Sequence, residues 1–410
     1  MTIVGKDTVT EGTQLEAVRR HNLATVLRIV HSEGAVSRSA LTHVTGLNRS
    51  TVGGIVSRLS ESHLVEEREP IASNRVGRPS PLVVPNPHVV AFAVNPEVDA
   101  ITVAVVGFNA HVAYRRRYST QTSVSAIEAV AITAELIREI ESTLPLQTRV
   151  VGVGVALPGL VRQADGLVRL APHLGWSDVP FATLLSGATG YSVWVANDAS
   201  LGAHAEHIFG AGRGIDNLVY LNGGPSGIGG GVIVAGSPLV GVNGYAGEFG
   251  HMMVNSEGLL CHCGARGCLE TEVSQESLYD VLGVEPGDRD DLTAMLTAAI
   301  SGGNLAVFSE TIRQMETLAH ALRAATNIFN PDRIILGGFL SALFACDPDR
   351  MTRMVASESL AMSSSTLTIT PAVLGADILM IGAADLAFAH LLEDPLGSQR
   401  TVSSVVVAGQ

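Results

Sequence analysis

Three of the four cysteines in this 410-residue chain lie within eight residues of one another, close enough to share a metal ion. They are Cys261, Cys263 and Cys268, and His251 precedes the first of them by ten residues. Zinc favours four thiolate or imidazole ligands in a tetrahedron, and three cysteines with one histidine form a standard closed set. Because no position is left for water, we predict a structural rather than a catalytic zinc site.

The residues around the cysteines leave two details of this site open. Gly264 and Gly267 allow the tight turns that wrap the chain around one ion. His262 competes with His251 as the fourth ligand, but its place between two cysteine ligands makes its approach awkward, and we favour His251. Three reduced core cysteines are the alternative to a metal site. The remaining cysteine, Cys346, stands alone and is expected to be a small core residue.

The elements that must position these residues begin with helices at the amino terminus. Apolar residues recur at helical spacing over residues 14–33, which predicts an amphipathic helix. A short helix is expected up to Thr45, with Ser37 as its cap, followed by a tight turn at residues 46–48. Another helix is expected over residues 49–60, capped by Asn48. Two short helices joined by a Gly-containing turn predict a helix-turn-helix.

A strand, a polar loop and a second strand are expected after these helices. The strands lie at residues 64–68 and 81–85, and the loop between them carries two arginines that can reach a minor groove or phosphates. Small or bidentate side chains on the outer face of the second helix suit a major groove. We therefore predict a winged helix-turn-helix with DNA contacts from Arg38, Asn48, Arg49, Ser50, Thr51, Ser57, Arg75 and Arg78. A small helical domain that binds protein is the alternative.

The distribution of charge supports two parts of different character. The chain has a net charge of −13, with 26 Lys and Arg against 39 Asp and Glu. Residues 1–90 hold ten of the cations and eight of the acids, which leaves 16 cations and 31 acids for the rest. The first part is therefore weakly basic and the second strongly acidic, as expected for a DNA-reading head on an acidic effector body.

From about residue 88 the sequence alternates between apolar strands and helices, which predicts an α/β architecture. Strands are expected at 89–94, 101–106, 150–157, 192–196, 218–221, 231–235 and 333–336, and helices near 124–142, 199–208, 304–329 and 378–392. Two lobes would leave a cleft, which is a usual place for a small molecule. We expect domains at 1–86 and 87–393, with residues 394–410 as a loose tail.

Two observations bear on location. No stretch of about 18 apolar residues lacks polar interruption, which argues against a membrane span. The first residues contain no apolar run like that of a signal peptide. A cytoplasmic protein without a membrane partner is expected.

These motifs together resemble the ROK family, which contains bacterial sugar-responsive repressors and sugar kinases. The resemblance covers nearly the whole chain. It is carried by the E-x-G-H step at 248–251, the C-x-C-G-x-x-G-C-L-E run at 261–270, and the segments 157–159, 197–199 and 330–338. The predicted amino-terminal winged helix-turn-helix matches the repressor branch, because the kinases of this family lack it.

The resemblance implies an actin-like, ribonuclease H-like sugar-kinase fold in two lobes, assembled as a dimer or tetramer. His251 would bind zinc through one ring nitrogen and a sugar hydroxyl through the other. His173 stands where the family often has asparagine, which bears on the identity of the sugar. The sugar-binding residues implied, with His173 included, are Asn197, Asp198, Glu248, His251, Glu270 and His173.

The same resemblance leaves a kinase as the second interpretation, because Asp198 takes the place of the family's catalytic base. Active relatives begin the domain with D-x-G-G-T. Here the equivalent position holds Asn95, followed by Pro96, which lacks a donor, and Glu97, which would repel phosphate. A second glycine-rich loop, at residues 226–231, departs less from the pattern of active relatives. We therefore expect a sensor without enzyme activity.

The leading hypothesis is a transcriptional repressor of sugar-utilisation genes whose affinity for an operator changes when a monosaccharide or derivative binds in the cleft. An ATP-dependent, glucokinase-like sugar kinase with an accessory DNA-binding head is the alternative. A third possibility is a zinc-stabilised scaffold that binds protein partners only.

Overall fold

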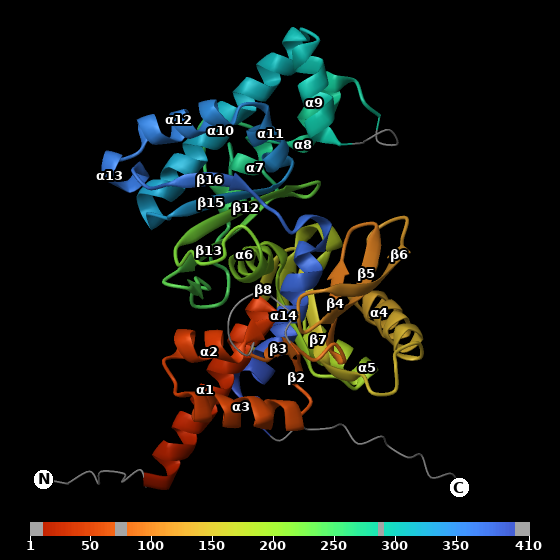
Figure 1. Cartoon of the computed structure of the whole chain (residues 1–410). Coiled ribbons are helices and arrows are strands. Elements are labelled where there is room, and N and C mark those ends of the chain that lie inside the picture. The colour runs from red at the N-terminus through yellow and green to blue at the C-terminus, as the bar shows by residue number, and fades with distance from the viewer. Residues whose placement is uncertain (1–10, 70–79, 286–290, 398–410) are drawn as a thin grey trace, which may run out of the picture.

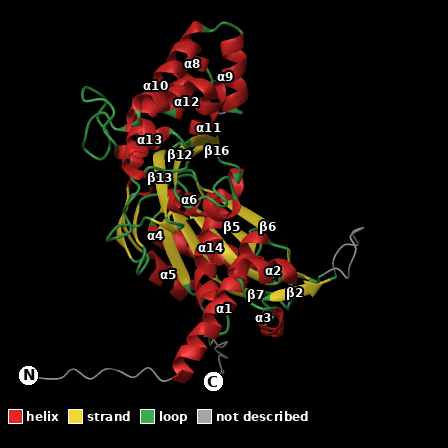
Figure 2. Cartoon of the chain, turned by 60° about the vertical axis from the view of Figure 1, so that its left-hand side comes forward, coloured by secondary structure: helices red, strands yellow, loops and turns green. Residues whose placement is uncertain are grey.

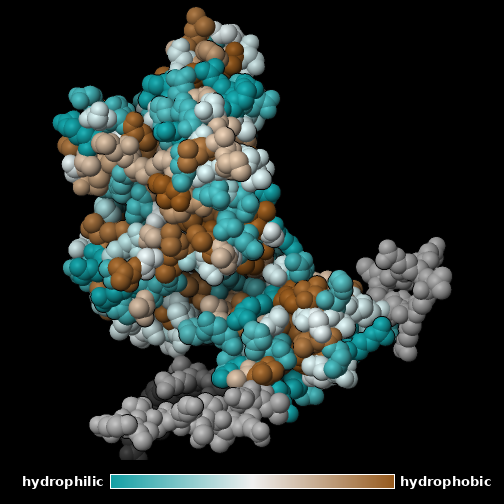
Figure 3. All heavy atoms as spheres, turned by 90° about the vertical axis from the view of Figure 1, so that its left-hand side faces the viewer, coloured by the Kyte–Doolittle hydropathy of each residue, from teal (hydrophilic) through white to brown (hydrophobic). Residues whose placement is uncertain are grey.

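The computed structural model describes residues 11–69, 80–285 and 291–397, and arranges them as a small head below two stacked lobes (Figure 1). Figure 3 shows the same arrangement from the side, with hydrophilic and apolar residues interspersed on the surface of the head. The head contains α1 (Glu11–Glu33), β1 (Val36–Ser37), α2 (Arg38–Thr45), α3 (Arg49–Glu61), β2 (Val65–Arg68) and β3 (Leu82–Pro85). Its three strands form an antiparallel sheet in the order β1-β3-β2.

Local sequence explains the short helices of the head. The hydroxyl of Ser37 accepts a hydrogen bond from the Ala40 amide and caps α2. Gly46 ends α2 in the left-handed conformation at φ 68°, and the Asn48 side chain caps α3 by accepting from the Thr51 amide. Both predicted caps are confirmed, α2 and α3 end within one residue of their predicted bounds, and α1 begins three residues before its predicted start. Two predicted DNA contacts, Arg75 and Arg78, lie outside the described residues.

The first lobe is built on a five-stranded sheet in the order β11-β7-β4-β5-β6. Helices α4 and α5 cover one face of this sheet, and a smaller antiparallel sheet, β10-β9-β8, lies beside it (Figure 2). The elements are β4 (Val89–Pro96), β5 (Ala100–Gly107), β6 (Val112–Ser119), α4 (Ala126–Glu141), β7 (Arg149–Leu157), β8 (Leu160–Arg162), β9 (Leu167–Ala171), η1 (Pro172–Leu174), β10 (Trp176–Val179), α5 (Phe181–Thr189) and β11 (Val193–Asn197).

The second lobe is built on another five-stranded sheet, ordered β14-β13-β12-β15-β16, with a group of helices packed on its outer face (Figure 1). Its strands are β12 (Leu218–Gly224), β13 (Gly227–Val234), β14 (Ser237–Pro238), β15 (Arg333–Gly338) and β16 (Thr368–Pro371). Its short helices are η2 (Phe249–His251), α7 (Leu269–Glu272), α8 (Gln275–Leu282), α9 (Leu292–Ser301), α11 (Phe339–Cys346), α12 (Pro348–Glu358), α13 (Ala361–Ser364) and η4 (Gly375–Asp377), and its long helix is α10 (Leu305–Phe329).

Two helices, α6 (Asp198–Phe209) and α14 (Ile378–Glu393), lie against each other between the two large sheets. Helix α14 packs on β7 and β4 of the first lobe, and α6 packs on β13 and β12 of the second. Within the described ranges, the segment Gly375–Glu393 is long and apolar enough to cross a membrane, yet most of it is buried. Its burial against both α6 and the first sheet is that of a core helix.

One hydrophobic core crosses the boundary predicted between head and effector body. It joins Val26, Leu27 and Val30 of α1 to Phe108 after β5 and to Phe388 of α14. All five side chains are almost fully buried. The carboxyl-terminal helix of the effector body therefore packs directly on the first helix of the head.

Candidate functional site

The predicted metal ligands come together at one end of the second lobe. The ligand atoms of His251, Cys261, Cys263 and Cys268 all lie within 4.8 Å of one another. His251 Nδ1 lies 3.6 Å from Cys261 Sγ, and the sulfurs of Cys263 and Cys268 are 3.7 Å apart. In a zinc tetrahedron with bonds of about 2.3 Å to sulfur, neighbouring ligand atoms are separated by about 3.5–3.8 Å. The four side chains can therefore hold a metal ion of this size.

Backbone turns bring the cysteines to this spacing. The Cys261 amide donates to the Ala265 carbonyl at 2.8 Å, and Met253 pairs with Cys268 in an isolated bridge. Gly267 has φ 68°, and a Cβ there would lie 1.5 Å from the Asn255 carbonyl oxygen, so only glycine fits. The turn that the sequence predicts at this glycine is present.

Burial raises the pKa of the Cys261 and Cys268 thiols, whereas a backbone hydrogen bond from Ala265 lowers the pKa of Cys263. A buried thiolate needs a compensating positive charge. A divalent cation bound among the three sulfurs would supply that charge, because it ligates the deprotonated form.

Glu270 lies beside the metal ligands and contacts both nearby histidines. Its Oε1 accepts from Cys261 Sγ at 3.0 Å and lies 3.4 Å from His251 Nδ1 and 3.2 Å from His262 Nδ1. Only 9% of the Glu270 side chain is exposed. His262 belongs to this carboxylate group and not to the set of three cysteines and His251, which agrees with the choice of His251 as the fourth ligand.

Two more of the predicted sugar-binding residues, Asn197 and Asp198, lie at the amino end of α6. The Asn197 side chain caps the helix by accepting from the Ser200 amide and donates to the Gly159 carbonyl at 3.1 Å. Asp198 Oδ1 accepts from the Ala199 amide, and burial raises the pKa of Asp198. Its second carboxylate oxygen has no hydrogen bond among the described residues. Asp198 can therefore offer that oxygen to a ligand hydroxyl.

The electrostatics of Glu248 connect it to the same group of side chains. Burial raises the pKa of Glu248, His251 lowers it, and the carboxylates of Asp198 and Glu270 raise it further. The charges of Asp198, Glu270 and His251 thus all act on Glu248, although these residues come from three separate segments of the chain. Carboxylates and an imidazole can bind vicinal hydroxyls, since each accepts or donates a hydrogen bond in a defined direction.

His173, in η1 of the first lobe, faces the cysteine loop of the second lobe. The rings of His173 and His262 meet edge to face with centroids 5.4 Å apart, and His262 meets His251 in the same way at 5.2 Å. Sequence reasoning treated His262 only as a rival metal ligand. The missing information was long-range, because nothing in the local sequence indicates that His262 lies next to His173.

The segment that the resemblance aligns with the first phosphate loop of active relatives holds a buried amide and an acidic side chain. Asn95, at the end of β4, is 6% exposed, and burial raises the pKa of Glu97 despite the nearby Arg117. The second glycine-rich segment lies within the hairpin of β12 and β13, where Gly229 and Gly231 pack against α6. A Cβ on either glycine would come within 2.6 Å of an alanine Cβ of that helix, so close helix packing explains them.

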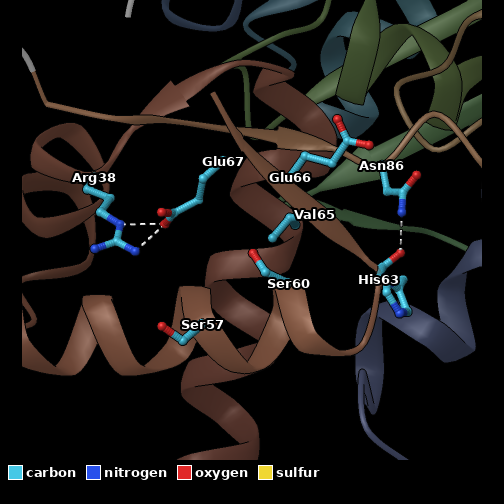
Figure 4. Close-up of a pocket in the computed structure, with 8 residues that line it drawn as sticks. All are labelled: Arg38, Ser57, Ser60, His63, Val65, Glu66, Glu67 and Asn86. Carbon is cyan, nitrogen blue, oxygen red and sulfur yellow. Dashed lines mark hydrogen bonds and ion pairs between the residues drawn. The ribbon is translucent and has the colours of Figure 1, made fainter. Parts of the chain in front are cut away.

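In the head, the predicted DNA contacts occupy two settings. Asn48, Arg49, Ser50 and Ser57 are exposed along α3 and its cap, and Thr51 is half-buried. Arg38 is different, because its guanidinium pairs with Glu67 of β2 at 2.6 Å at one end of a cavity of about 510 Å³ (Figure 4).

Ser57 of α3 lines the same cavity, and at its other end Asn86 donates to the His63 carbonyl (Figure 4). Arg58, also exposed on α3, was not among the predicted DNA contacts. The sequence could have indicated that Arg58 is exposed, because it lies between Val56 and Leu59, which face inward on the same helix.

Comparison with known proteins identifies the family. The ROK family model matches residues 92–390. The chain is 25% identical over 393 residues to the xylose repressor of Caldicellulosiruptor bescii, covering 92% of this chain and 98% of the relative. It is 36% identical over 205 residues to the glucokinase of Thermotoga maritima, covering 46% of this chain and 64% of that enzyme.

A solved ROK family transcriptional regulator, a homologue of the Escherichia coli MLC protein, superposes on the structure with a TM-score of 0.75 at 24% identity. The match covers 92% of this chain, head included, and 97% of the regulator. The two-lobed α/β fold is therefore shared with this regulator. Because the family model matches well over half of its length, the chain belongs to the ROK family.

Proposed function

We propose that this protein is a DNA-binding repressor of sugar-utilisation genes whose operator affinity is changed by a monosaccharide or derivative in the interlobe cleft. One observation carries the proposal: Asp198, Glu248, Glu270 and His251 converge at one site, in an effector body whose carboxyl-terminal helix shares a core with the head. Full-length similarity to a protein named as a xylose repressor supports both parts.

The metal in this proposal is a structural zinc ion held by His251 and the three clustered cysteines. Bound there, zinc would fix the loop that carries His251 and polarise no substrate, since all four positions are filled. The other ring nitrogen of His251 would then be left to bind a hydroxyl. The sugar would be recognised by side chains of the protein. The carboxylates would accept hydrogen bonds from its hydroxyl groups, and Asn197 would stabilise the amino end of α6 as its cap.

The head in this proposal is a winged helix-turn-helix. Helix α3 would enter the major groove with the exposed side chains of its amino-terminal turn, and the segment between β2 and β3 would reach the backbone or minor groove. A cytoplasmic homodimer or homotetramer on an operator with two half-sites related by two-fold symmetry is the expected assembly.

Sensing is favoured over phosphorylation by the state of the phosphate-binding segments. Glu97 places a carboxylate where a kinase would need donors, and the glycines of β13 are used for helix packing. Asp198 can bind a hydroxyl without removing its proton. A coupled ADP-release assay over hexoses and N-acetylhexosamines, with Asp198→Asn as control, tests this choice: turnover that is lost in the variant would establish the kinase.

DNA binding is tested by retardation of DNA from upstream of the protein's own gene at low salt. We expect retardation by the wild type and a loss of about tenfold or more in affinity for Arg49→Ala combined with Arg58→Ala. Arg353→Ala, an exposed arginine on α12 of the second lobe, serves as the matched charge control and should bind like the wild type. Failure of the wild type to bind with and without sugars would refute the repressor.

A further inference from the structure

A single buried carboxylate on α14 binds one histidine from the head and one from the effector body. Asp385 Oδ1 lies 2.6 Å from His31 Nε2 of α1, and Asp385 Oδ2 lies 2.5 Å from His204 Nε2 of α6. The Asp385 side chain is 7% exposed and that of His31 is 4% exposed. These three residues, called the Asp385 bridge below, join three helices that are far apart in the sequence.

Both ring nitrogens of His31 lie against oxygen atoms of other residues. Its other ring nitrogen, Nδ1, lies 2.6 Å from the Phe108 carbonyl oxygen, which can only accept a hydrogen bond. Both ring nitrogens therefore face acceptors, and both are satisfied only when His31 is an imidazolium. The ring is packed between aromatic side chains, with its centroid 4.4 Å from that of Phe108 and 5.7 Å from that of Phe388. A cation in this apolar setting depends on Asp385 for its counter-charge.

His204 connects the bridge to the ligand site along one helix. It lies on α6, which begins at Asp198 with Asn197 as its cap, so fewer than two turns separate the ligand-facing end from the bridge. Asn197, His204 and Asp385 also line one cavity of about 180 Å³ between α6, α14 and the second sheet. The cavity leaves room on this side of α6, while another side of the helix packs closely on Gly229 and Gly231 of β13.

We propose that Asp385 is the positioning residue through which ligand binding at the amino end of α6 changes the placement of α1 in the head. His204 holds one oxygen of the Asp385 carboxylate, so when α6 moves the carboxylate moves with it, and the bond from His31 to the other oxygen strengthens or loosens in the same sense. The bond from His31 then sets how firmly α1 is held on α14. This inference rests on the proposed function only for the identity of the two ligands, sugar and DNA. The link between α6, α14 and α1 does not depend on that function.

A second contact between the same helices is weaker and serves as a comparison. Arg213 Nη2, in the loop that follows α6, lies 2.7 Å from Glu33 Oε2 of α1, and both side chains are about half exposed. Solvent screens such a pair, so its contribution to coupling is small. The buried bridge is the contact that can transmit a change between the two parts.

The link is tested first without sugar or DNA, by hydrogen–deuterium exchange of the α1 amides over residues 23–31 in the full chain. His204→Leu removes the donor to Asp385 and should speed this exchange about tenfold. His207→Leu is the matched control on the same helix, since the His207 ring makes no hydrogen bond to Asp385 in the described structure, and should leave exchange within about twofold. His204→Gln places an amide near the lost Nε2 and should restore slow exchange.

Unchanged exchange in α1 for His204→Leu, or equal acceleration by the control, would overturn the proposal. Folding is verified by the exchange of α10 in the second lobe, which should match the wild type. If His204→Leu does not fold, His204→Gln against Asp385→Asn provides the same comparison, because Asp385→Asn keeps the shape and removes the charge. We then expect faster α1 exchange in Asp385→Asn but not in His204→Gln. Slow α1 exchange in both variants would contradict the proposal.

The functional consequence is measured as the ratio of operator affinities without and with saturating sugar. For a coupled regulator this ratio is about 5–150. In Asp385→Asn it should fall toward one, while affinity for sugar alone, measured by calorimetry, stays near the wild-type value. A ratio that stays at the wild-type value would overturn the proposal. If the wild type itself shows no sugar effect on DNA, the proposed function fails, and the exchange experiment still decides on the bridge.

Discussion

Two regions to which the family resemblance assigns ligands, called the hydroxyl-binding side and the nucleotide side below, differ in their chemistry. On the hydroxyl-binding side, Asp198, Glu248 and Glu270 lie near His251, which together with three cysteines could hold a metal ion. On the other side, the position of the first phosphate loop holds a buried Asn95 and the acidic Glu97. One side offers carboxylates for hydroxyl groups, and the other offers a negative charge where a nucleotide would bring phosphates.

This difference teaches that binding and catalysis can be separated within one fold. A kinase needs both sides, because phosphoryl transfer depends on donors and cations around the phosphates. A sensor needs only the hydroxyl-binding side and a link to the head. The structure provides that link in α6 and α14, which meet between the lobes and reach α1. The following experiments act on one side of the cleft or the other.

The largest effect is expected from removing a metal ligand on the hydroxyl-binding side. Cys268→Ala should reduce bound zinc from about one per chain to near zero and lower the free energy of unfolding by several kcal/mol. Zinc content by mass spectrometry and thermal unfolding measure this. Cys346→Ala, whose sulfur contacts only the Ala342 carbonyl among the polar groups described, is the matched control and should keep its zinc. Zinc retained in Cys268→Ala would contradict the ligand set.

A smaller effect is expected from Asp198→Asn, which keeps the size of the side chain and removes its charge. A hydrogen bond to a charged group contributes about 1.5–3 kcal/mol, so sugar affinity should fall about 10- to 150-fold. Calorimetry with the best sugar from a thermal-shift panel gives the number. Asp349→Asn, an exposed aspartate on α12, should bind sugar like the wild type. Equal affinities for all three proteins would remove Asp198 from the site.

The nucleotide side should respond little to its own ligand. Magnesium ATP at 5 mM should stabilise the protein by less than about 0.4 kcal/mol, the value reached when the ligand concentration equals its dissociation constant. A bound sugar at 100 times its dissociation constant should instead give about 2.7 kcal/mol. Thermal shifts with each ligand alone measure both. A nucleotide effect as large as that of the sugar would abolish the contrast between the two sides.

The smallest effect concerns pH and the link from the cleft to the head. Against desolvation by burial, the hydrogen bond and charge of Asp385 raise the net pKa of His204. Its pairing therefore stabilises the fold fully below the unfolded value of about 6.5 and is lost as pH rises through the higher folded pKa. Burial alone would raise the pKa of Asp385, but the hydrogen bonds and charges of His204 and His31 outweigh burial and lower it. The stabilisation from this carboxylate is therefore lost only in strong acid.

His204→Gln keeps a donor to Asp385 but does not titrate there. The wild type should therefore lose stability relative to this variant as pH rises above about 6.5, by on the order of 1 °C in Tm. The other titratable groups are present in both proteins and cancel to first order. A difference in Tm that does not change with pH would show that His204 carries no titrating charge in the fold.

The sequence predicts best what local chemistry decides. Ser37 and Asn48 cap their helices as expected, because a cap depends on neighbours within three residues. The cysteine loop is equally local. Strand β6 is not predicted, since it lies at an exposed sheet edge where Arg115 and Arg117 pair with acids and no apolar alternation is needed.

The Asp385 bridge could not be predicted from the sequence. His31 and Asp385 are 354 positions apart, and each is one polar residue on an otherwise apolar helix face. Their pairing depends on how α1 packs on α14, which only the assembled core determines. The same applies to His173 and His262, which come from different lobes.

The central claim is that a sugar in the cleft changes the affinity of the head for DNA. The direct measurement is fluorescence anisotropy of a labelled duplex from upstream of the protein's own gene, titrated with protein at fixed salt, with and without saturating sugar. We predict that sugar weakens DNA binding by about tenfold or more in the wild type and by less than twofold in Asp198→Asn. Equal DNA affinity with and without every sugar that binds would contradict the account.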